Sequence, residues 1–184
     1  MEKLRGRRVV LRPVSMGDRP LLRQWIGNRE LRKYFGRRLS ILAGTQTVSS
    51  PRDLQFLILL REGNRAVGLC GLFGISSDDG TAEAGIVLGE RDTWGQGYGP
   101  EALQLLVGHA YRDLGLSQVS LCVQTTNTRA IRAYEKVGFA VEQRLTLGKW
   151  LFGRGVEVLV MTLPAPTGAE PRAREAQGCS VPRG

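Results

Sequence analysis

Three glycines at every second position mark the most informative stretch of the chain, Trp94-Gly95-Gln96-Gly97-Tyr98-Gly99. They follow a strand-like run that ends near Glu90 and precede an amphipathic helical pattern. Glycine lets backbone N–H groups crowd round a bulky anion, and it tolerates a positive φ. A helix N-terminus adds unpaired N–H donors and the positive end of the helix dipole. The residue types and their spacing therefore predict a cradle for a diphosphate.

Three kinds of diphosphate cradle compete for this loop. A Walker loop would end in Gly-Lys-Ser/Thr, but Pro100 and Glu101 follow the last glycine here. A dinucleotide fingerprint would need an acidic residue about 20 positions further on, and the next strand-like run, 118–123, carries none. The loop of coenzyme A-dependent acyltransferases, Arg/Gln-x-x-Gly-x-Gly/Ala, matches with Trp94 in its first place. A glycine-rich turn with no ligand stays open as an alternative.

A second motif lies one helix and one strand further along the chain. The run Asn127-Thr128-Arg129-Ala130-Ile131-Arg132-Ala133-Tyr134-Glu135-Lys136-Val137-Gly138-Phe139 resembles the N-x-x-A-I-x-x-Y-E-K-x-G-F signature of the GNAT acetyltransferases. Within that superfamily, Leu11-Arg12-Pro13-Val14 and Trp25-Ile26-Gly27-Asn28 are similar to the Rim-type branch, which acetylates protein N-termini. The resemblance covers about residues 7–163. The two main motifs are specific jointly, although neither would be alone.

The resemblance implies an α+β (α/β) fold of GNAT type. Its central sheet is expected to be mixed and mostly antiparallel, with about six to seven strands, a splayed parallel pair and about four flanking helices. One acetyltransferase domain would span residues 1–163. Residues 164–184 are rich in Pro, Ala, Gly and charge, and this composition predicts a disordered tail. Acetyl-CoA is the co-substrate that the resemblance implies.

The same resemblance assigns the contacts with acetyl-CoA, most of which the backbone would make. The pantetheine arm would pair with the main chain of the splayed strand, and the amides of the glycine loop would hold the pyrophosphate. Asn127 would hydrogen-bond the arm, although its place at the start of a helix equally predicts an N-cap. The expected cofactor-binding residues are Val87, Leu88, Gly89, Gly95, Gln96, Gly97, Tyr98, Gly99, Pro100 and Asn127.

Two residues are expected to carry the direct transfer of the acetyl group to an amine. Tyr134 would protonate the departing thiolate, because a phenol with a reference pKa of about 10 can do so. A core tyrosine is the alternative. Many relatives place a glutamate five residues before the motif asparagine, where this chain has Cys122. Glu83 is therefore the candidate general base, directly or through water, with an exposed strand acid as the alternative. His109 is expected to be structural.

Hydrophobic periodicity predicts the elements that position these groups. Strands are expected over 8–14, 54–60, 66–75, 81–88 and 119–123, followed by a hairpin that turns at Gly153-Arg154-Gly155. Helices are expected from Asp18, over 30–35, after the glycine loop as far as Gly115, and from Asn127. Residues 36–50 are expected to form a loop.

Composition and cysteine usage bound the class of protein. A chain of 184 residues that is 42% apolar is long enough for one domain with an ordinary core. No apolar run is long enough to span a bilayer, and the N-terminus has no signal-peptide h-region. Cys70, Cys122 and Cys179 do not form a metal-ligand pattern. No metal is therefore expected, and the cytoplasm is the default location.

The net charge of +9 lies entirely at the N-terminal end of the chain. Residues 1–38 hold twelve Lys and Arg against three Asp and Glu, whereas the remaining residues hold fourteen of each. A solvated helix face would explain this charge. A nucleic-acid partner is not expected, because no aromatic stacking platform or recognition motif accompanies the charge.

The acceptor amine is inferred from this charge. In the family, the first two helices and the final hairpin form most of the acceptor site, and the first two helices are the basic part here. A polyamine or aminoglycoside would be repelled, whereas an acidic protein terminus would be attracted. A protein or peptide N-terminus is thus the expected acceptor. The alternatives are a small-molecule acetyltransferase, acting on an antibiotic, polyamine or amino acid, and a non-catalytic acyl-CoA-binding module. The protein is expected to be a monomer or homodimer without a membrane partner.

Overall fold

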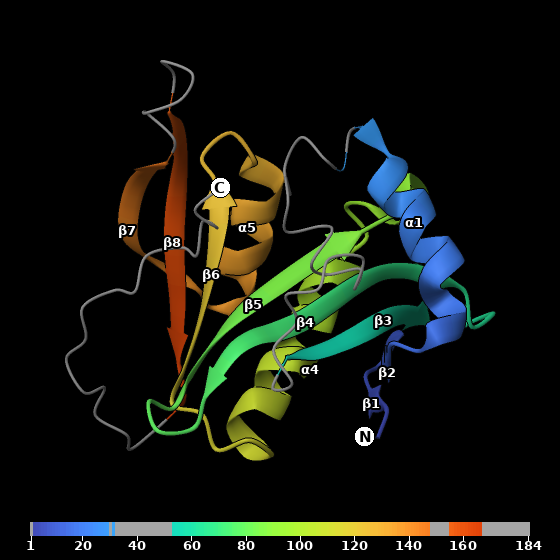
Figure 1. The fold of residues 1–184 in the computed structure, drawn as a ribbon, viewed down its shortest axis with the longest axis horizontal. Helices are drawn as coiled ribbons and strands as arrows, with labels where there is room; N and C mark the ends of the chain where they lie inside the picture. The colour runs from blue at the N-terminus through green and yellow to red at the C-terminus, as the bar shows by residue number, and fades with distance from the viewer. Residues whose placement is uncertain (1, 30, 32–52, 148–154, 167–184) are drawn as a thin grey trace.

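The sheet contains eight strands in the order β1-β2-β3-β4-β5-β6-β8-β7 (Figure 1). The computed structural model describes residues 2–29, 31, 53–147 and 155–166. The strands are β1 (Leu4–Arg5), β2 (Val9–Pro13), β3 (Leu54–Leu60), β4 (Ala66–Ser76), β5 (Thr81–Leu88), β6 (Gln118–Gln124), β7 (Ala140–Leu147) and β8 (Val156–Pro164). All neighbouring strands are antiparallel except β5 and β6, which are parallel.

Helices cover both faces of the sheet. The helices α4 (Tyr98–Arg112) and α5 (Thr128–Val137) pack on one face, and α1 (Arg19–Gly27) packs on the other (Figure 1). Each face accordingly has its own buried cluster, one around Leu103 and Leu106 of α4 and one around Leu22 and Trp25 of α1. Within the described residues, no helix is long and apolar enough to cross a membrane.

Strand β3 shows why the sequence requires two covering layers. Successive side chains of a strand point to opposite faces of the sheet. Phe56 and Ile58 belong to the cluster beneath α4, whereas Leu57 and Leu59 belong to the cluster beneath α1. The unbroken apolar run of β3 is therefore the pattern of a strand that is buried on both faces.

The sheet splits between β5 and β6. Their parallel ladder contains only three residue pairs, from Thr81 with Gln118 to Glu83 with Ser120. Strand β5 nevertheless continues to Leu88, paired with β4, and β6 continues to Gln124, paired with β8. Figure 1 shows the two strands starting side by side and then separating. The expected splayed parallel pair is thus confirmed.

Most expected elements are confirmed, with shifts at their ends. The eighth strand arises from β1, whose two residues pair with β2 and are too few to show periodicity. Helix α4 ends at Arg112, three residues before Gly115, which has a φ of 65° in the following turn. The loop expected at 36–50 lies outside the described residues, as do most of the helix expected at 30–35, most of the last hairpin turn and most of the tail. The division into a domain and a tail stays a prediction.

Asp18 starts α1 as expected, but its carboxylate does not cap the helix. It accepts hydrogen bonds from the Arg12 guanidinium at 2.6 and 3.0 Å and from the Ser15 backbone at 2.7 Å. The Arg12 bonds are the main cause that lowers the Asp18 pKa to about 2, against the opposing effect of burial. Asp18 therefore joins the end of β2 to the start of α1.

Candidate active site

A cavity of about 440 Å³ lies between the end of β5 that has separated from β6, the glycine loop and α5. Ile86, Val87 and Leu88 form the β5 wall. Four members of the glycine loop, Gly95, Gly97, Gly99 and Pro100, line the cavity beside Trp94 and Leu103. The α5 wall runs from Asn127 to Lys136 and includes Tyr134. The two sequence motifs, separated by a helix and a strand, therefore meet at one site.

The glycine loop adopts the backbone that its sequence requires. Gly95 and Gly97 have φ values of 75° and 84°, in the left-handed region that favours glycine. Gly97 is the N-cap of α4, and Gly99 lies within the first turn with an ordinary φ. The first amides of a helix have no intrahelical acceptor and point outward along its axis. The loop therefore presents unpaired N–H groups that suit a diphosphate.

Gln96 and Tyr98 support the loop and are not among the described residues that line the cavity. The Gln96 side chain donates a hydrogen bond to the carbonyl of Asp92. The backbone carbonyl of Gln96 accepts a hydrogen bond from the guanidinium of Arg8, which lies just before β2. The same guanidinium lies over the Tyr98 ring. Contacts by backbone amides of residues 96 and 98, as the resemblance implies, remain a prediction.

Only alternate residues of β5 present main-chain groups to the cleft, which is the gap that opens between β5 and β6. The N–H of Gly89 donates to the carbonyl of Val67 on β4 at 2.9 Å. Because N–H and C=O groups alternate between the two edges of a strand, Val87 also turns its polar groups toward β4. Ile86 and Leu88 turn theirs toward the gap left by β6. Val87 and Leu88 line the cavity, but Gly89 does not, and its amide is already used within the sheet.

Trp94 bridges the two sides of the cavity mouth. Its indole N–H donates to the Leu88 carbonyl at 3.1 Å. The guanidinium of Arg129, in the first turn of α5, lies 3.6 Å from the centroid of its ring. The sequence identified Trp94 only as an unusual first residue of the loop. Its stacking with Arg129 had no local signal, because 35 residues separate the two.

Asn127 occupies the N-cap of α5, and its side-chain oxygen accepts from the amide of Ala130 at 3.2 Å. It also lines the cavity, so both of its expected roles are compatible with its place. Three cations of α5 line the same cavity, namely Arg129, Arg132 and Lys136. Among the described lining residues there is no Asp or Glu. The cavity is therefore suited to an anionic ligand.

Tyr134 is both a core residue and a lining residue of the cavity. The residue is 8% exposed, and its ring packs against Phe139 with the centroids 6.3 Å apart. Burial raises the pKa of its phenol to about 12. The phenol is therefore neutral at physiological pH and can donate its proton, as the expected role requires.

The structure does not bring Glu83 to this cavity. Glu83 forms the last residue pair between β5 and β6, opposite Ser120, and is not among the described lining residues. Cys122, which takes the place of the glutamate of many relatives, pairs with Val160 on β8 and does not line the cavity either. The assignment of the general base to Glu83 stays a prediction.

His109 lies on α4, and its side chain is 11% exposed. Its Nδ1 is 2.6 Å from the Asp113 carboxylate, and its ring meets Phe56 edge to face at 6.0 Å. Its Nε2 is buried without a hydrogen-bond partner among the described residues. His109 is not among the described residues that line the cavity, so its expected structural role stays a prediction.

Comparison with known proteins places this site in a family. The model of the acetyltransferase (GNAT) domain matches residues 8–140. A relative from Bacillus licheniformis, named uncharacterized N-acetyltransferase p20, is 29% identical over 177 residues, which cover 89% of this chain and 96% of the relative.

Two solved structures from Vibrio cholerae share the fold. The spermidine N-acetyltransferase in complex with CoA and spermine has a TM-score of 0.72 and 22% identity, covering 85% of this chain and 95% of its own. A provisionally named ribosomal-protein-serine acetyltransferase has a TM-score of 0.69 and 19% identity, covering 89% and 97%. With the family match over most of the chain, these findings identify the protein as a member of the GNAT acetyltransferase family and an acetyl-CoA-dependent N-acetyltransferase.

Proposed function

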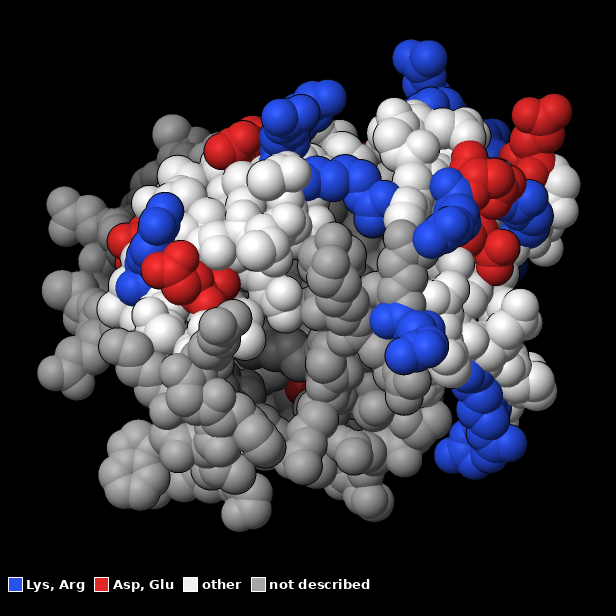
Figure 2. Space-filling model, turned by 90° about the horizontal axis from the view of Figure 1, so that it is seen from above, with Lys and Arg blue, Asp and Glu red and all other residues white. Residues whose placement is uncertain are grey.

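We propose that the acceptor is the α-amine of a protein or peptide N-terminus, as in the Rim-type branch of the family. The observation that carries this proposal is the distribution of charge. The whole excess of positive charge lies in residues 1–38. In the view from above, Lys and Arg side chains stand across the described part of the surface, with groups of Asp and Glu among them (Figure 2). A net excess of positive charge attracts an acidic polypeptide and repels a polycation.

The cavity itself supports the same choice. Arg129, Arg132 and Lys136 line it, and no described acidic residue does. A polyamine needs carboxylates to offset the cost of desolvating its own charges. Strand β5 and the segment after it carry Glu83, Glu90 and Asp92, none of which is among the described lining residues. Glu90 accepts the indole N–H of Trp25 at 2.8 Å, and Asp92 pairs with Arg65.

We infer a direct transfer in which this chain supplies positioning and one proton. When bound, acetyl-CoA supplies the thioester. The loop amides around Gly97 hold the pyrophosphate, and the cleft edge of Ile86 and Leu88 aligns the pantetheine arm. The neutral amine attacks the thioester carbonyl carbon, the carbon–sulfur bond breaks, and the hydroxyl of Tyr134 gives its proton to the sulfur. The proton lost by the amine would pass to Glu83 through water, because Glu83 is not among the described residues that line the cavity.

A small polyamine is the second candidate acceptor, and one observation favours it. A spermidine N-acetyltransferase shares the fold over 95% of its own chain. The two candidates make opposite demands on charge near the acceptor site, so salt and acceptor charge distinguish them.

The test is thiol release from acetyl-CoA with matched acceptors. Three peptides would share one N-terminal residue and differ in the next four positions, which would be acidic, neutral or basic. Spermidine would be the fourth acceptor. We expect kcat/KM to fall from the acidic to the basic peptide by about tenfold at low salt, and the difference to shrink at about 0.5 M salt. Spermidine as the best acceptor would refute the proposal. Binding of CoA without thiol release from any acceptor would favour the non-catalytic module.

The proposal extends to the Rim-type branch of the family and to the location and oligomeric state of the protein. A Rim-type enzyme would work in the cytoplasm, as a monomer or a homodimer. Size-exclusion chromatography with light scattering would separate the two oligomeric states.

A further inference from the structure

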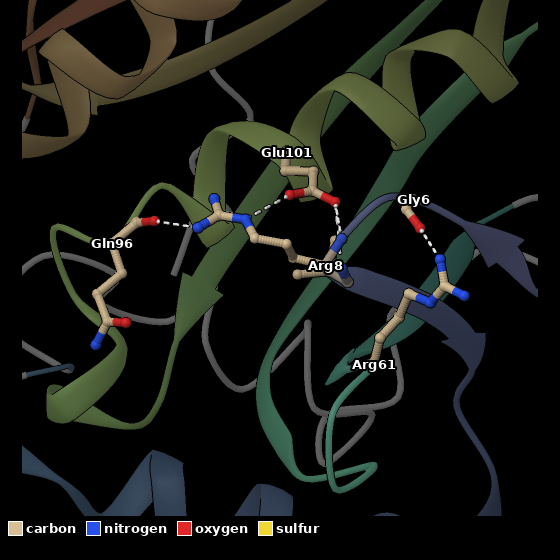
Figure 3. Close-up of polar contacts among 6 residues, drawn as sticks. Gly6, Arg8, Arg61, Gln96 and Glu101 are labelled. Carbon is tan, nitrogen blue, oxygen red and sulfur yellow. Dashed lines mark hydrogen bonds and ion pairs between the residues drawn. The ribbon is translucent and has the colours of Figure 1, made fainter.

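A single arginine ties the N-terminal segment to the glycine loop (Figure 3). The Nη1 of Arg8 donates to the carbonyl of Gln96 at 3.0 Å, and its Nε donates to Glu101 Oε2 at 3.2 Å. Its guanidinium carbon lies 4.8 Å from the centroid of the Tyr98 ring. One side chain therefore contacts the loop at three points, from the middle of the loop to the first turn of α4.

Glu101 completes this connection from the side of the helix. Its Oε1 accepts hydrogen bonds from the backbone N–H groups of Arg8 at 2.6 Å and Val9 at 3.2 Å. A side chain at Gly6 would place its Cβ only 2.7 Å from the same oxygen, so glycine leaves room for the carboxylate. Burial opposes ionisation of Glu101, but the hydrogen bonds from Arg8 and Val9 outweigh it and keep the pKa of the carboxyl below its ordinary value. Glu101 is thus a carboxylate at neutral pH.

A carboxylate in this position would weaken the binding of a diphosphate. Glu101 lies in the first turn of α4, and the amides of that turn are the ones offered to the diphosphate. An unpaired negative charge there would repel the diphosphate through a region that water screens only in part. The Arg8 guanidinium cancels that charge and at the same time fixes the carbonyl of Gln96, whose neighbour Gly97 starts the helix.

We propose that Arg8 is a positioning residue for the diphosphate end of acetyl-CoA, which holds the glycine loop in its binding conformation and neutralises Glu101. The inference rests on acetyl-CoA as the co-substrate and not on the identity of the acceptor. Arg8 does not line the cavity, so it acts through the loop and through its charge. A failure of the proposed acceptor therefore leaves this inference intact.

The test compares Arg8→Met with a matched control, Arg61→Met. Arg61 is an exposed arginine on the adjacent segment, and its Nη1 donates to the carbonyl of Gly6 at 3.3 Å without touching the loop (Figure 3). Calorimetry would give the Kd for CoA, and an NMR titration would give the Kd for pantetheine, which lacks the diphosphate. We expect Arg8→Met to raise the Kd for CoA about tenfold and the Kd for pantetheine less than about twofold. Arg61→Met should change neither.

Two further variants separate the two parts of the role. Glu101→Gln removes the charge but keeps an oxygen for the amides of Arg8 and Val9. Added to Arg8→Met, it should recover about threefold of the lost affinity for CoA. Arg8→Lys keeps the charge but cannot reach both Gln96 and Glu101, so its Kd should lie between those of the wild type and Arg8→Met.

Three results would overturn the proposal. The first is an unchanged Kd for CoA in Arg8→Met. The second is an equal loss for CoA and pantetheine, which would indicate general damage to the fold. The third is a double variant as weak as Arg8→Met, which would refute the neutralisation of Glu101. If Arg8→Met does not fold, Arg8→Lys carries the same comparison of the two ligands.

Discussion

The replacement Tyr134→Phe removes a single oxygen from the cavity and tests the proposed proton transfer. The pKa of the phenol is raised by burial to about 12, whereas a free thiol has a pKa of about 8.5. The donor is therefore a weaker acid than the thiol that it forms, by about 3 to 4 pKa units. General acids contribute about 10²- to 10⁴-fold to rates, and this mismatch favours the lower end of that range. We expect kcat to fall about 100-fold.

Binding and folding should change little in the same variant. The hydroxyl has no hydrogen-bond partner among the described residues, and the ring keeps its contact with Phe139. The Kd for CoA should stay within about twofold of the wild type, and the free energy of unfolding within about 1 kcal/mol. The assay is thiol release at saturating acetyl-CoA, with calorimetry and thermal melting as controls. A variant that retains more than half of the wild-type kcat would show that Tyr134 is only a core residue.

The pH dependence of Tyr134 gives an independent check on its environment. Its folded-state pKa lies above the unfolded value of about 10, so unfolding favours loss of the proton. The contribution of Tyr134 to stability is thus fully present below pH 10 and is lost as the pH rises toward 12. Tyr134→Phe should reduce the loss of stability in that window. The same slope in both proteins would contradict the assigned burial of the phenol.

Three further predictions concern the loop, the first helix and the cavity mouth. Gly97→Ala should lower the free energy of unfolding by about 1 to 2 kcal/mol, because alanine would have to adopt a φ of 84°. Gly99→Ala should lower it less, since the φ of Gly99 is ordinary and its Cβ would meet only van der Waals contacts. Equal losses of stability in thermal melting would refute this distinction. Asp18, with its pKa lowered to about 2, stabilises the fold above the unfolded pKa of about 4 and loses that effect as the pH falls toward 2. In urea titrations, Asp18→Asn should therefore lower the free energy of unfolding by about 2 kcal/mol at pH 7 and by almost nothing at pH 2. CoA should change the fluorescence of Trp94, which lines the cavity, and a signal that survives in Trp94→Phe would assign it to another tryptophan, for example Trp25 of α1.

Local patterns explain which parts of the fold could be predicted from the sequence. The glycine spacing required positive φ values, and Gly95 and Gly97 have them. The apolar alternation of β5 and the run of β3 define their faces without any tertiary information. Asn127 carries the side chain of an N-cap directly before a helical pattern, and it caps α5. In each case, the responsible interaction lies within a few residues of the signal.

The parts that could not be predicted depend on distant partners. The contact of Arg8 with Gln96 joins residues 88 positions apart, and a surface arginine carries no signal for its partner. The use of the Gly89 amide became evident only from its pairing with β4, because a shift of one residue reverses which groups of a strand face the cleft. Glu83 likewise pairs with Ser120 on β6, a residue distant in the sequence, and is not among the described residues that line the cavity.

The three-pair ladder between β5 and β6 also governs how the molecule comes apart. Strands β1 to β5 form one antiparallel unit and β6, β8 and β7 form another, so few main-chain hydrogen bonds cross the junction. Cooperative unfolding of the two units then depends on the packing of α4 against α5 and on any ligand bound between β5 and β6. A bound pantetheine arm, bonded to the open edge of β5, would act as a missing strand and join the two units. Amide hydrogen exchange should therefore slow on both sides of the junction when CoA binds, including in β7, which lies at the far edge of the sheet.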